Sequence, residues 1–467
     1  MKITLVRSMA RSAVFELVNS GCYRAPAPYT VSLDGATVCE GDTNVFSLYS
    51  LEPGRSYTLA VTLDGVTDTL NFTTAEESFF VDASRYGLVA DGVTDNTAKL
   101  QAALSTCPAG GTVYVPAGTY RTQSLFLQSS TTLYLEKGCT LLGGTNRTDY
   151  PILPGVLPCH NEKDEHYLGL WEGNPLDSFA GLLNITQVHD VVVTGEGTLD
   201  CDAENGDWWV TPKIKRIAWR PRAVAAVDSE NICLHGITVQ NSYSWTIHPI
   251  FVKHLDLLNF NINNPYNAPN TDGIDPESCK NVNIIGNHVH VGDDCIALKS
   301  GKLFLGMKLH VPCENVIIRN CCLSRGHGGL VIGSEMSGGV KNVTVTQCLM
   351  DHTDRGLRVK TRRPEAHAIL RIQNVSDDFS VSHGPGCPRR RAVEETASIL
   401  RPIRTQPVYF EGQPVIQIPA DRPPHDSDAH KLSIHHTAQG KLVPPHRLMV
   451  AVVLCDKSVG LGQGYRT

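Results

Sequence analysis

Four short motifs bring together residue types that can transfer protons and hold an anion. In chain order they are Asn270-Thr271-Asp272, Gly292-Asp293-Asp294, Gly326-His327-Gly328 and Arg358-Val359-Lys360. They supply three carboxylates, one imidazole and two cations. Neighbouring carboxylates repel each other, so one of them holds its proton more tightly than the other. The set therefore suits a reaction in which one group donates a proton while another accepts one, on a negatively charged ligand.

Each motif alone also has a simpler interpretation. An Asp pair in a turn is usually a turn former, and a lone histidine is usually structural. Glycine on both sides of His327 favours a close approach of the backbone to another group. Arg358 and Lys360 would share one face of a strand, which is either a binding face or an ordinary charged surface. The combination of the four motifs favours a catalytic site.

A repeated unit predicts the scaffold that positions these motifs. Asn281, Asn315 and Asn342 each open a unit of the form Asn-Val-x-Ile or Asn-Val-x-Val, and they follow one another at intervals of 34 and 27 residues. Periods of 20–50 residues are typical of solenoids. The units are rich in β-branched residues and no amphipathic helix separates them. We therefore expect an all-β fold, a right-handed parallel β-helix, in which the Asn side chains hydrogen-bond to the backbone or to one another at the turns.

The chain is expected to have three parts. Residues 1–78 contain runs of β-formers that end at Asp34-Gly35 and Asp64-Gly65, which predicts hairpins. The stretch Leu51-Glu52-Pro53-Gly54-Arg55-Ser56-Tyr57 resembles the turn and corner tyrosine of fibronectin type III sandwiches. A small β-sandwich over residues 1–78 and a β-helical catalytic domain over residues 79–362 follow from these patterns.

Residues 363–467 break the pattern. They hold eleven of the 27 prolines and seven of the 18 histidines of the chain, but only one asparagine. Segments such as Asp421-Arg422-Pro423-Pro424-His425 cannot form central strands. We interpret this Pro/His-rich tail as irregular, either as a natural extension or, as the abrupt change favours, as the product of a reading-frame shift near Arg363.

Composition limits the partners and the compartment. The formal net charge of −6 gives no reason to expect nucleic acid as a partner. The first residues show neither a secretory signal nor a membrane span, so a cytoplasmic protein is expected and an exported one is the alternative. The 15 cysteines form no C-x-x-C pair, so no metal site is expected, and in a reducing cytoplasm most of them would be small buried hydrophobes. The oligomeric state stays open.

From about Asp82 to Arg362 the chain resembles glycoside hydrolase family 28, the polygalacturonases. All four motifs occur in the family's order, and the stretch from Gly292 to Gly301 also matches its pattern. The resemblance implies a right-handed parallel β-helix that hydrolyses α-1,4-linked galacturonic acid with inversion, without a metal or another cofactor.

The resemblance also implies a role for each residue. Asp293 would be the general acid, Asp272 and Asp294 would activate the attacking water, and His327 would support the protonation of the acid. Arg358 and Lys360 would bind a carboxylate of the acidic polysaccharide or oligogalacturonide. Asn270 would be a turn and groove residue that contacts substrate.

The mode of action is less constrained. The stretch from Asn146 to Asp177 is a long insertion rich in proline and charge, and such a loop could close one end of the groove. Together with the N-terminal sandwich it resembles bacterial exo-acting members of the family. The alternatives are a polysaccharide lyase that uses calcium and a basic residue on a similar β-helix, and a non-catalytic glycan-binding solenoid.

Overall fold

The structure is a computed structural model of the chain. It describes residues 2–161 and 163–360, and beyond them the backbone of six short strands between residues 368 and 453. The predicted irregular tail and its reading frame therefore lie outside the described residues, apart from those strands.

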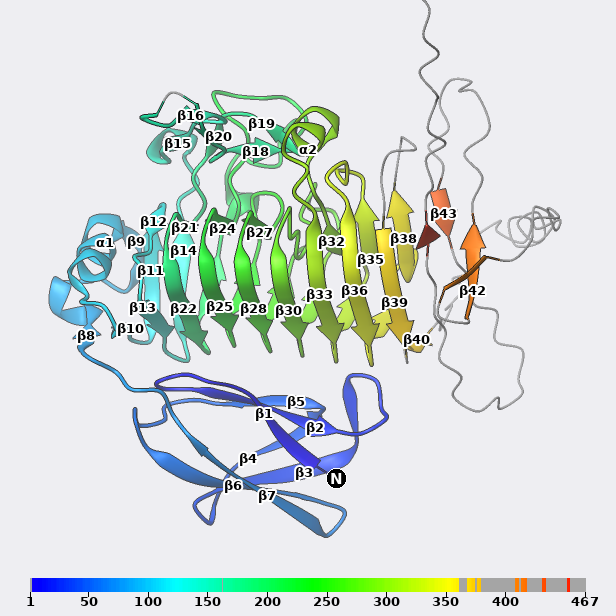
Figure 1. Cartoon of the computed structure of the whole chain (residues 1–467). Helices are drawn as coiled ribbons and strands as arrows, with labels where there is room; N and C mark the ends of the chain where they lie inside the picture. The colour runs from blue at the N-terminus through cyan, green and yellow to red at the C-terminus, as the bar shows by residue number, and fades with distance from the viewer. Residues whose placement is uncertain are drawn as a thin grey trace, which may run out of the picture.

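The N-terminal part is a sandwich of two antiparallel sheets, in the order β1-β2-β5 and β4-β3-β6-β7 (Figure 1). Backbone φ angles are positive at both residues of Asp34-Gly35 and of Asp64-Gly65, which makes these pairs the tight hairpin turns that the sequence predicts. The Tyr57 hydroxyl accepts a hydrogen bond of 2.8 Å from the backbone N–H of Glu52. The strands are β1 (Lys2–Ser8), β2 (Ala13–Val18), β3 (Arg24–Leu33), β4 (Ala36–Thr43), β5 (Val45–Leu48), β6 (Ser56–Leu63) and β7 (Val66–Thr73).

The following residues form a parallel β-helix with three sheets, which confirms the predicted fold class (Figure 1). The first sheet contains β8 (Phe80–Asp82), β10 (Gly111–Val115), β13 (Thr131–Leu135), β22 (His189–Gly195), β25 (Glu230–His235), β28 (Lys253–Leu258), β30 (Lys280–Ile285), β33 (Cys313–Arg319), β36 (Val340–Thr346) and β39 (Ala368–Gln373). The second sheet contains β9 (Asp91–Asp95), β11 (Gly118–Thr122), β14 (Cys139–Gly143), β23 (Thr198–Asp200), β26 (Thr238–Gln240), β29 (Asn261–Asn263), β31 (His288–His290), β34 (Cys322–Ser324), β37 (Leu349–Asp351) and β40 (Ser376–Asp378). Strands β39 and β40 thus extend two sheets beyond residue 362, the domain boundary expected from the sequence.

The third sheet carries the motifs. Isolated bridges from Ile247 to Ile274 and from Ile274 to Ile296 join its two halves. The strands are β12 (Leu125–Phe126), β21 (Leu183–Thr186), β24 (Val224–Val227), β27 (Ile247–Ile250), β32 (Asp294–Leu298), β35 (Gly328–Gly333) and β38 (Leu357–Lys360).

Smaller elements cover the ends and one side of the β-helix. The helical ones are η1 (Ala83–Tyr86), α1 (Thr97–Thr106), η2 (Arg147–Asp149), η3 (Ala203–Asn205) and α2 (Leu303–Leu309). Three antiparallel pairs lie between β14 and β21, namely β15 (Ile152–Leu153) with β20 (Ser178–Phe179), β16 (Leu157–Pro158) with β17 (Glu165–His166), and β18 (Leu170–Trp171) with β19 (Asn174–Pro175). The backbone strands beyond β40 are β41 (Val408–Phe410), β42 (Gln413–Gln417), β43 (Lys431–Ser433) and β44 (Val452–Val453). No helix among the described residues is long and apolar enough to cross a membrane.

The repeated asparagines occupy one position in successive coils. Asn315 Nδ2 donates to Asn281 Oδ1 at 2.9 Å, and Asn342 Nδ2 donates to Asn315 Oδ1 at 3.1 Å. All three residues have a left-handed backbone, with φ of 59°, 58° and 52° for Asn281, Asn315 and Asn342. Asparagine tolerates this conformation better than most residues because its short side chain can hydrogen-bond locally. The expected hydrogen bonds between asparagines of successive coils are confirmed, but the three residues lie inside β30, β33 and β36 and not in turns between strands.

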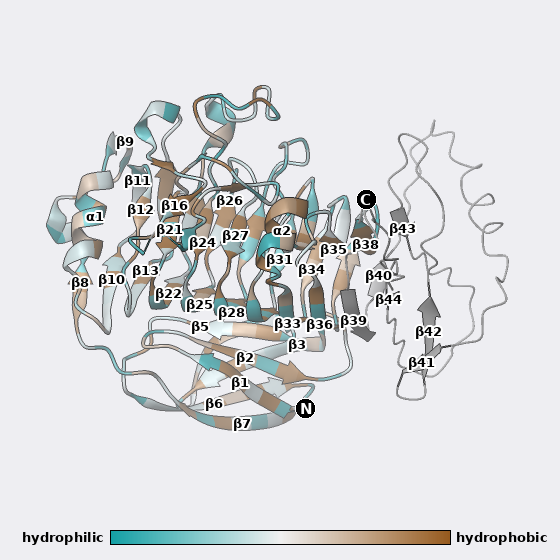
Figure 2. Ribbon diagram, turned by 45° about the horizontal axis from the view of Figure 1, so that its top comes forward, coloured by the Kyte–Doolittle hydropathy of each residue, from teal (hydrophilic) through white to brown (hydrophobic). Residues whose placement is uncertain are grey.

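The interior is apolar, and the sandwich packs against the outside of the first sheet. Figure 2 shows hydrophobic residues concentrated along the strands of the β-helix. Ten of the described cysteines are buried and none is in a disulfide, as expected for small core residues. Met9, Val14 and Val45 of the sandwich form a second apolar cluster with residues of β25, β28 and β30. An ion pair of 2.8 Å between Glu16 and Arg319 adds to this contact.

Candidate active site

The structure brings the acid, histidine and basic motifs together on the outer face of the third sheet. Asp293 lies in the turn between β31 and β32, Asp294 begins β32, and His327 precedes β35. One oxygen from each of Asp272, Asp293 and Asp294 lies within 4.8 Å of the others. Parallel coils stack in register, so motifs 20 to 90 residues apart in sequence become neighbours in space, as roughly expected for a solenoid with this repeat length.

Asp293 forms a pair with His327. The His327 Nδ1 atom lies 3.5 Å from Asp293 Oδ1, and the backbone N–H of Asp294 donates to the same oxygen at 3.0 Å. Burial acts to raise the pKa of Asp293, but the hydrogen bond and charge of His327, with Lys360 and Lys299, outweigh it and lower that pKa. The bond to Asp293 in turn raises the pKa of His327. The pair therefore favours an ionised Asp293 and a protonated His327.

The glycines around His327 have the role that the sequence suggested. A Cβ atom on Gly326 would lie 2.5 Å from the carbonyl oxygen of Asp293 and 2.6 Å from Cys295 Sγ. Gly328 pairs directly with Asp294 across adjacent strands. Without side chains at these two positions, the backbone can approach the acid pair closely.

Asp294 is bound by both cations of the last motif. Lys360 Nζ donates to Asp294 Oδ2, and Arg358 Nη1 lies 3.8 Å from Asp294 Oδ1. Strand β38 places Arg358 and Lys360 on its outer face, because Val359 between them faces the core. Lys360 retains 23% side-chain exposure, whereas Asp294 has 2%. Lys360 is thus a partly open cation beside a buried carboxylate.

Asp272 is a buried acid with little compensation. Its Oδ2 atom lies 3.9 Å from Lys299 Nζ. Burial first, and then the charges of Asp275, Asp293 and Asp294, raise the pKa of Asp272 well above its ordinary value. The proton in this cluster therefore resides more readily on Asp272 than on Asp293.

Asn270 has a different contact from the one expected. Its Oδ1 atom accepts a hydrogen bond of 2.7 Å from Arg220 Nη2, and its backbone φ is 56°. Arg220 also donates to the carbonyls of Tyr243 and Pro269 at 2.8 Å. In this arrangement Asn270 fixes a buried arginine beside the site, and its contact with substrate stays a prediction.

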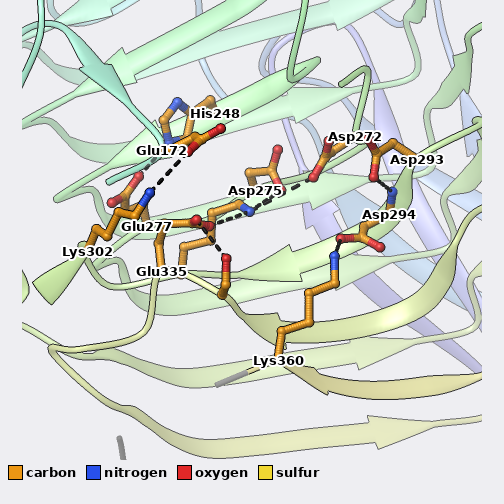
Figure 3. A network of polar contacts seen from close by, with 12 residues as sticks. Glu172, His248, Asp272, Asp275, Glu277, Asp293, Asp294, Lys302, Glu335 and Lys360 are labelled. Carbon is orange, nitrogen blue, oxygen red and sulfur yellow. Dashed lines mark hydrogen bonds and ion pairs between the residues drawn. The ribbon is translucent and has the colours of Figure 1, made fainter. Parts of the chain in front are cut away.

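A buried charge network behind Asp272 was missed by the sequence reasoning. Figure 3 shows Asp275 beside Asp272, with Glu277, Glu335 and His248 on the side of Asp275 away from Asp293. His248 Nε2 lies 2.8 Å from Glu277 Oε2, and Arg222 Nε donates to His248 Nδ1 at 3.1 Å. Burial raises the pKa of Glu277 to about 7 and that of Asp275 to about 8. The proximity of Asp275 and Glu277 to Asp272 in sequence was the available signal for these two acids.

A wall of aromatic and basic side chains lies next to this network and consists of Trp171, Trp219, Trp245, Arg220 and Arg222. Trp171 stacks on Trp219 with ring centroids 4.6 Å apart and lies parallel to Trp245 at 6.0 Å. The guanidinium of Arg222 lies 5.0 Å from the Trp171 ring and 4.9 Å from the Trp245 ring. Burial lowers the pKa of Arg222 to about 10, which still leaves it charged at neutral pH. Trp245 lies in this wall and is 5% exposed.

The insertion packs against part of the third sheet. Strand alternation directs His248 and Asp275 outward, because Ile247 and Ile274 face the core. Both are nevertheless buried, and the insertion packs against this part of the sheet through Tyr167 and Leu170 with Ile250, and through Trp171 with Trp245. Ion pairs Lys302–Glu172 at 3.0 Å and Lys308–Glu165 at 2.6 Å attach the insertion to the α2 region. Figure 1 shows β15 to β20 and α2 on the same side of the β-helix.

The geometry allows one water molecule to contact more than one acid. Oxygens within 4.8 Å of one another can both lie at hydrogen-bond distance from a water between them. Within residues 2–161 and 163–360, these three aspartates form the one group of acid, histidine or cysteine side chains close enough to hold a metal ion. Lys360 and Arg358 already supply positive charge to Asp294 at this place, so this carboxylate has cationic partners of its own.

Comparison with known proteins identifies the family of this segment. Residues 161–376 match the family model of the glycosyl hydrolases family 28, and residues 80–146 match a model described as rhamnogalacturonase A/epimerase, pectate lyase-like. A probable polygalacturonase of Vitis vinifera is 32% identical over 241 residues, which are 50% of this chain and 47% of that protein. An exo-poly-alpha-D-galacturonosidase of Dickeya chrysanthemi is 26% identical over 304 residues, 54% of this chain and 48% of that protein.

This chain thus spans about half the length of these curated relatives. The solved structure of a family 28 exopolygalacturonase of Yersinia enterocolitica covers 80% of this chain and 79% of its own, with a TM-score of 0.62 and 20% identity, which shows a shared fold. The β-helical residues 161–376, which carry all four motifs, belong to glycosyl hydrolase family 28.

Proposed function

We propose that this protein hydrolyses α-1,4-linked galacturonic acid in polygalacturonan or oligogalacturonides. The observation that carries the proposal is the convergence of Asp272, Asp293 and Asp294, with oxygens within 4.8 Å, beside the partly open cation of Lys360. Two or more carboxyl groups can donate and accept protons at a glycosidic bond. A cation in reach can bind the carboxylate that distinguishes galacturonic acid from neutral sugars.

In the proposed mechanism Asp293 protonates the leaving glycosidic oxygen. Asp272 and Asp294 hold a water molecule and accept its proton as its oxygen bonds to the anomeric carbon. Arg358 and Lys360 bind the carboxylate of a galacturonate unit, and His327 orients Asp293 through the Nδ1 contact of 3.5 Å. These roles follow the family resemblance, and the proximity of the groups supports them.

The mechanism needs a proton on Asp293. In the free site the proton is held more readily by Asp272, because the pKa of Asp272 is raised and that of Asp293 is lowered. Interacting carboxyl groups titrate as a pair, so a proton shared by them can occupy either one. A substrate carboxylate at Lys360 and His327 would neutralise part of the positive charge that keeps Asp293 ionised. Substrate binding would thereby raise the pKa of Asp293 and transfer the acid function to it.

The proposal includes exo action. The insertion covers the outer face of the third sheet around His248, while Arg358 and Lys360 on β38 stay partly exposed. A chain laid along this face would therefore end near the tryptophan wall. A face closed at one end favours release of short products from a chain end over random cleavage.

Two product analyses test the proposal. The first incubates purified protein with polygalacturonate and follows product lengths over time. Mono- or digalacturonate from the start supports exo hydrolysis, a ladder of intermediate lengths supports endo hydrolysis, and an ultraviolet-absorbing unsaturated sugar supports a lyase instead. No release of reducing sugar would contradict an enzymatic function on this substrate.

The second analysis concerns stereochemistry. Carboxyl groups of inverting glycosidases commonly lie about 6.5–9.5 Å apart, whereas oxygens of this triad lie within 4.8 Å. Inversion therefore rests on the family resemblance and not on the spacing. Proton NMR of the first product should show the β-anomer; initial appearance of the α-anomer would contradict inversion.

We propose that the enzyme acts in the cytoplasm on imported oligogalacturonides, because the ten buried cysteines among the described residues are free thiols, as a reducing compartment would keep them. Cell fractionation with an antibody to the protein tests this. Accumulation outside the cytoplasmic membrane would contradict it and would favour action on polymer.

A further inference from the structure

We propose that Lys299 is a positioning residue that keeps Asp272 able to ionise from the buried side of the site. The inference rests on the proposed hydrolysis and adds the group that sets the pH range of the water-activating acid. It starts from the position of Lys299, which lies directly after β32 and pairs with Glu277 of the preceding coil. Its side chain is 4% exposed, so it lies behind the acids and not in contact with solvent-borne substrate.

Lys299 lies at increasing distances from three buried carboxylates. Its Nζ atom lies 3.2 Å from Glu335 Oε2, 3.7 Å from Asp275 Oδ1 and 3.9 Å from Asp272 Oδ2. Only the contact with Glu335 is a hydrogen bond. The ammonium also lies 4.5 Å from the centre of the Trp245 ring, which fixes it on its outer side. Asp272 therefore receives charge compensation without a hydrogen bond, which leaves its oxygens free for water.

The charge balance around Lys299 is unfavourable to ionised acids. No hydrogen-bond donor reaches either oxygen of Asp275, which is completely buried. His248 is held neutral, because burial and the neighbouring cations lower its pKa well below its ordinary value. The charged and titratable groups that face Lys299 and Asp272 are Asp275, Glu277, Asp293, Asp294, Glu335, Arg220, Arg222 and His248. Removal of Lys299 would leave Asp272 and Asp275 with Arg220 and Arg222 as their remaining cations.

Two lysines thus flank the acid triad with different tasks. Lys360 contacts Asp294 from the partly open side and Lys299 approaches Asp272 from the closed side. Lys360 is the candidate for binding substrate, so its loss should act on KM. Lys299 cannot reach substrate, so its loss should act on the pH dependence of kcat/KM.

The test measures kcat/KM for an oligogalacturonide as a function of pH in wild type, Lys299→Met, Lys299→Arg and Glu335→Gln. In Lys299→Met the acid limb should move up by about one pH unit or more, with a loss of about tenfold or more on that limb and little change in KM. Glu335→Gln should move the same limb down, because Lys299 is then released from its partner towards Asp272. Lys299→Arg should restore much of the wild-type limb, and Lys280→Met, an exposed lysine of the first sheet, is the control.

A uniform loss of activity at all pH values in Lys299→Met, or shifts of the same sign in Lys299→Met and Glu335→Gln, would overturn the inference. If wild type does not cleave galacturonan, the proposed function fails, and the inference is still tested without substrate. The melting temperature of Lys299→Met should then fall more steeply than that of wild type between neutral and alkaline pH, because buried acids with a further raised pKa release protons on unfolding. Equal slopes in the two proteins would overturn the inference.

Discussion

At the residue scale, the acids of the site differ in environment. The pKa of Asp293 is lowered beside His327, burial raises the pKa of Asp272, and Asp294 is bound by Lys360 and Arg358. Groups whose surroundings separate their pKa values are the usual source of paired acid and base functions. The assignment of Asp293 as the acid can therefore be tested against Asp272.

Asp293→Asn should lower kcat on oligogalacturonides by on the order of 10²–10⁴, the usual contribution of a general acid. The matched comparison is Asp272→Asn, assayed with an aryl galacturonide whose leaving group needs no proton. Asp293→Asn should recover much of its rate with that substrate, and Asp272→Asn should not. Recovery by Asp272→Asn alone would make Asp272 the general acid. That outcome would agree with the pKa order of the free site, in which Asp272 holds a proton more readily than Asp293.

Lys360→Ala should raise KM for oligogalacturonides about tenfold or more, since a hydrogen bond between charged groups contributes on the order of 1.5–3 kcal/mol. It should also lower kcat, because Lys360 contacts Asp294. The effect on KM should be much smaller with methyl-esterified oligomers, which lack the anion. Equal changes with both substrates would show that Lys360 acts only through Asp294.

At the scale of elements, the insertion is the part that is expected to determine product length. Trp171→Ala should loosen the insertion, because its ring stacks on Trp219 at 4.6 Å and lies parallel to Trp245. Products of polygalacturonate digestion should then become longer and more varied. Phe304→Ala on α2 is the control, since that ring is 69% exposed. An unchanged product pattern in Trp171→Ala would mean that the insertion does not determine product length.

The hydrogen-bonded asparagines of β30, β33 and β36 should stabilise the first sheet. Asn315→Ala forces a left-handed backbone on alanine and should destabilise the protein by about 1–2 kcal/mol. Asn315→Gly loses the same hydrogen bonds but accepts the backbone, so its loss should be smaller. Urea unfolding monitored by circular dichroism measures both. A larger loss for Gly than for Ala would show that backbone conformation is not the reason for asparagine here.

At the scale of the whole molecule, the buried acids should make stability depend on pH. Burial raises the pKa of Asp275 from 3.8 to about 8 and that of Glu277 from 4.5 to about 7. Above pH 6.5 the unfolded chain has already released these protons while the folded protein still holds them, so stability falls as pH rises. His235 and His248 act in the opposite direction, but only below about pH 6.5, where the unfolded histidines bind protons.

The free energy of unfolding should therefore decrease by on the order of 2 kcal/mol between pH 6.5 and 8 from Asp275 alone. Guanidinium titrations at the two pH values measure this difference. Asp275→Asn should remove most of it, while Asp256→Asn on the first sheet should not. A stability that rises over this interval would contradict the raised pKa of the buried acids.

The sequence by itself determined the repeat, the turns and the identity of the chemical groups. Asparagine recurs at positions 281, 315 and 342, once per coil, because a left-handed backbone restricts the residue type locally. The glycines beside His327 likewise indicated that the backbone there lies close to another group. A side chain on Gly326 would collide with the carbonyl oxygen of Asp293. The same local rule predicted the hairpins at Asp34-Gly35 and Asp64-Gly65. Such features depend on one or a few neighbouring residues and are therefore visible in sequence.

Only the tertiary structure decided how the groups are charged and which of them are covered. Asp275, Glu277 and Lys299 lie in one buried network because coils stack, and Trp171, some 100 residues earlier in the chain, packs against Trp245 beside Lys299. The order of the pKa values of Asp272 and Asp293 follows from that burial and from His327. The contact of Asn270 with Arg220 was equally invisible. Burial and charge are properties of all neighbours in space, and no single motif contains them.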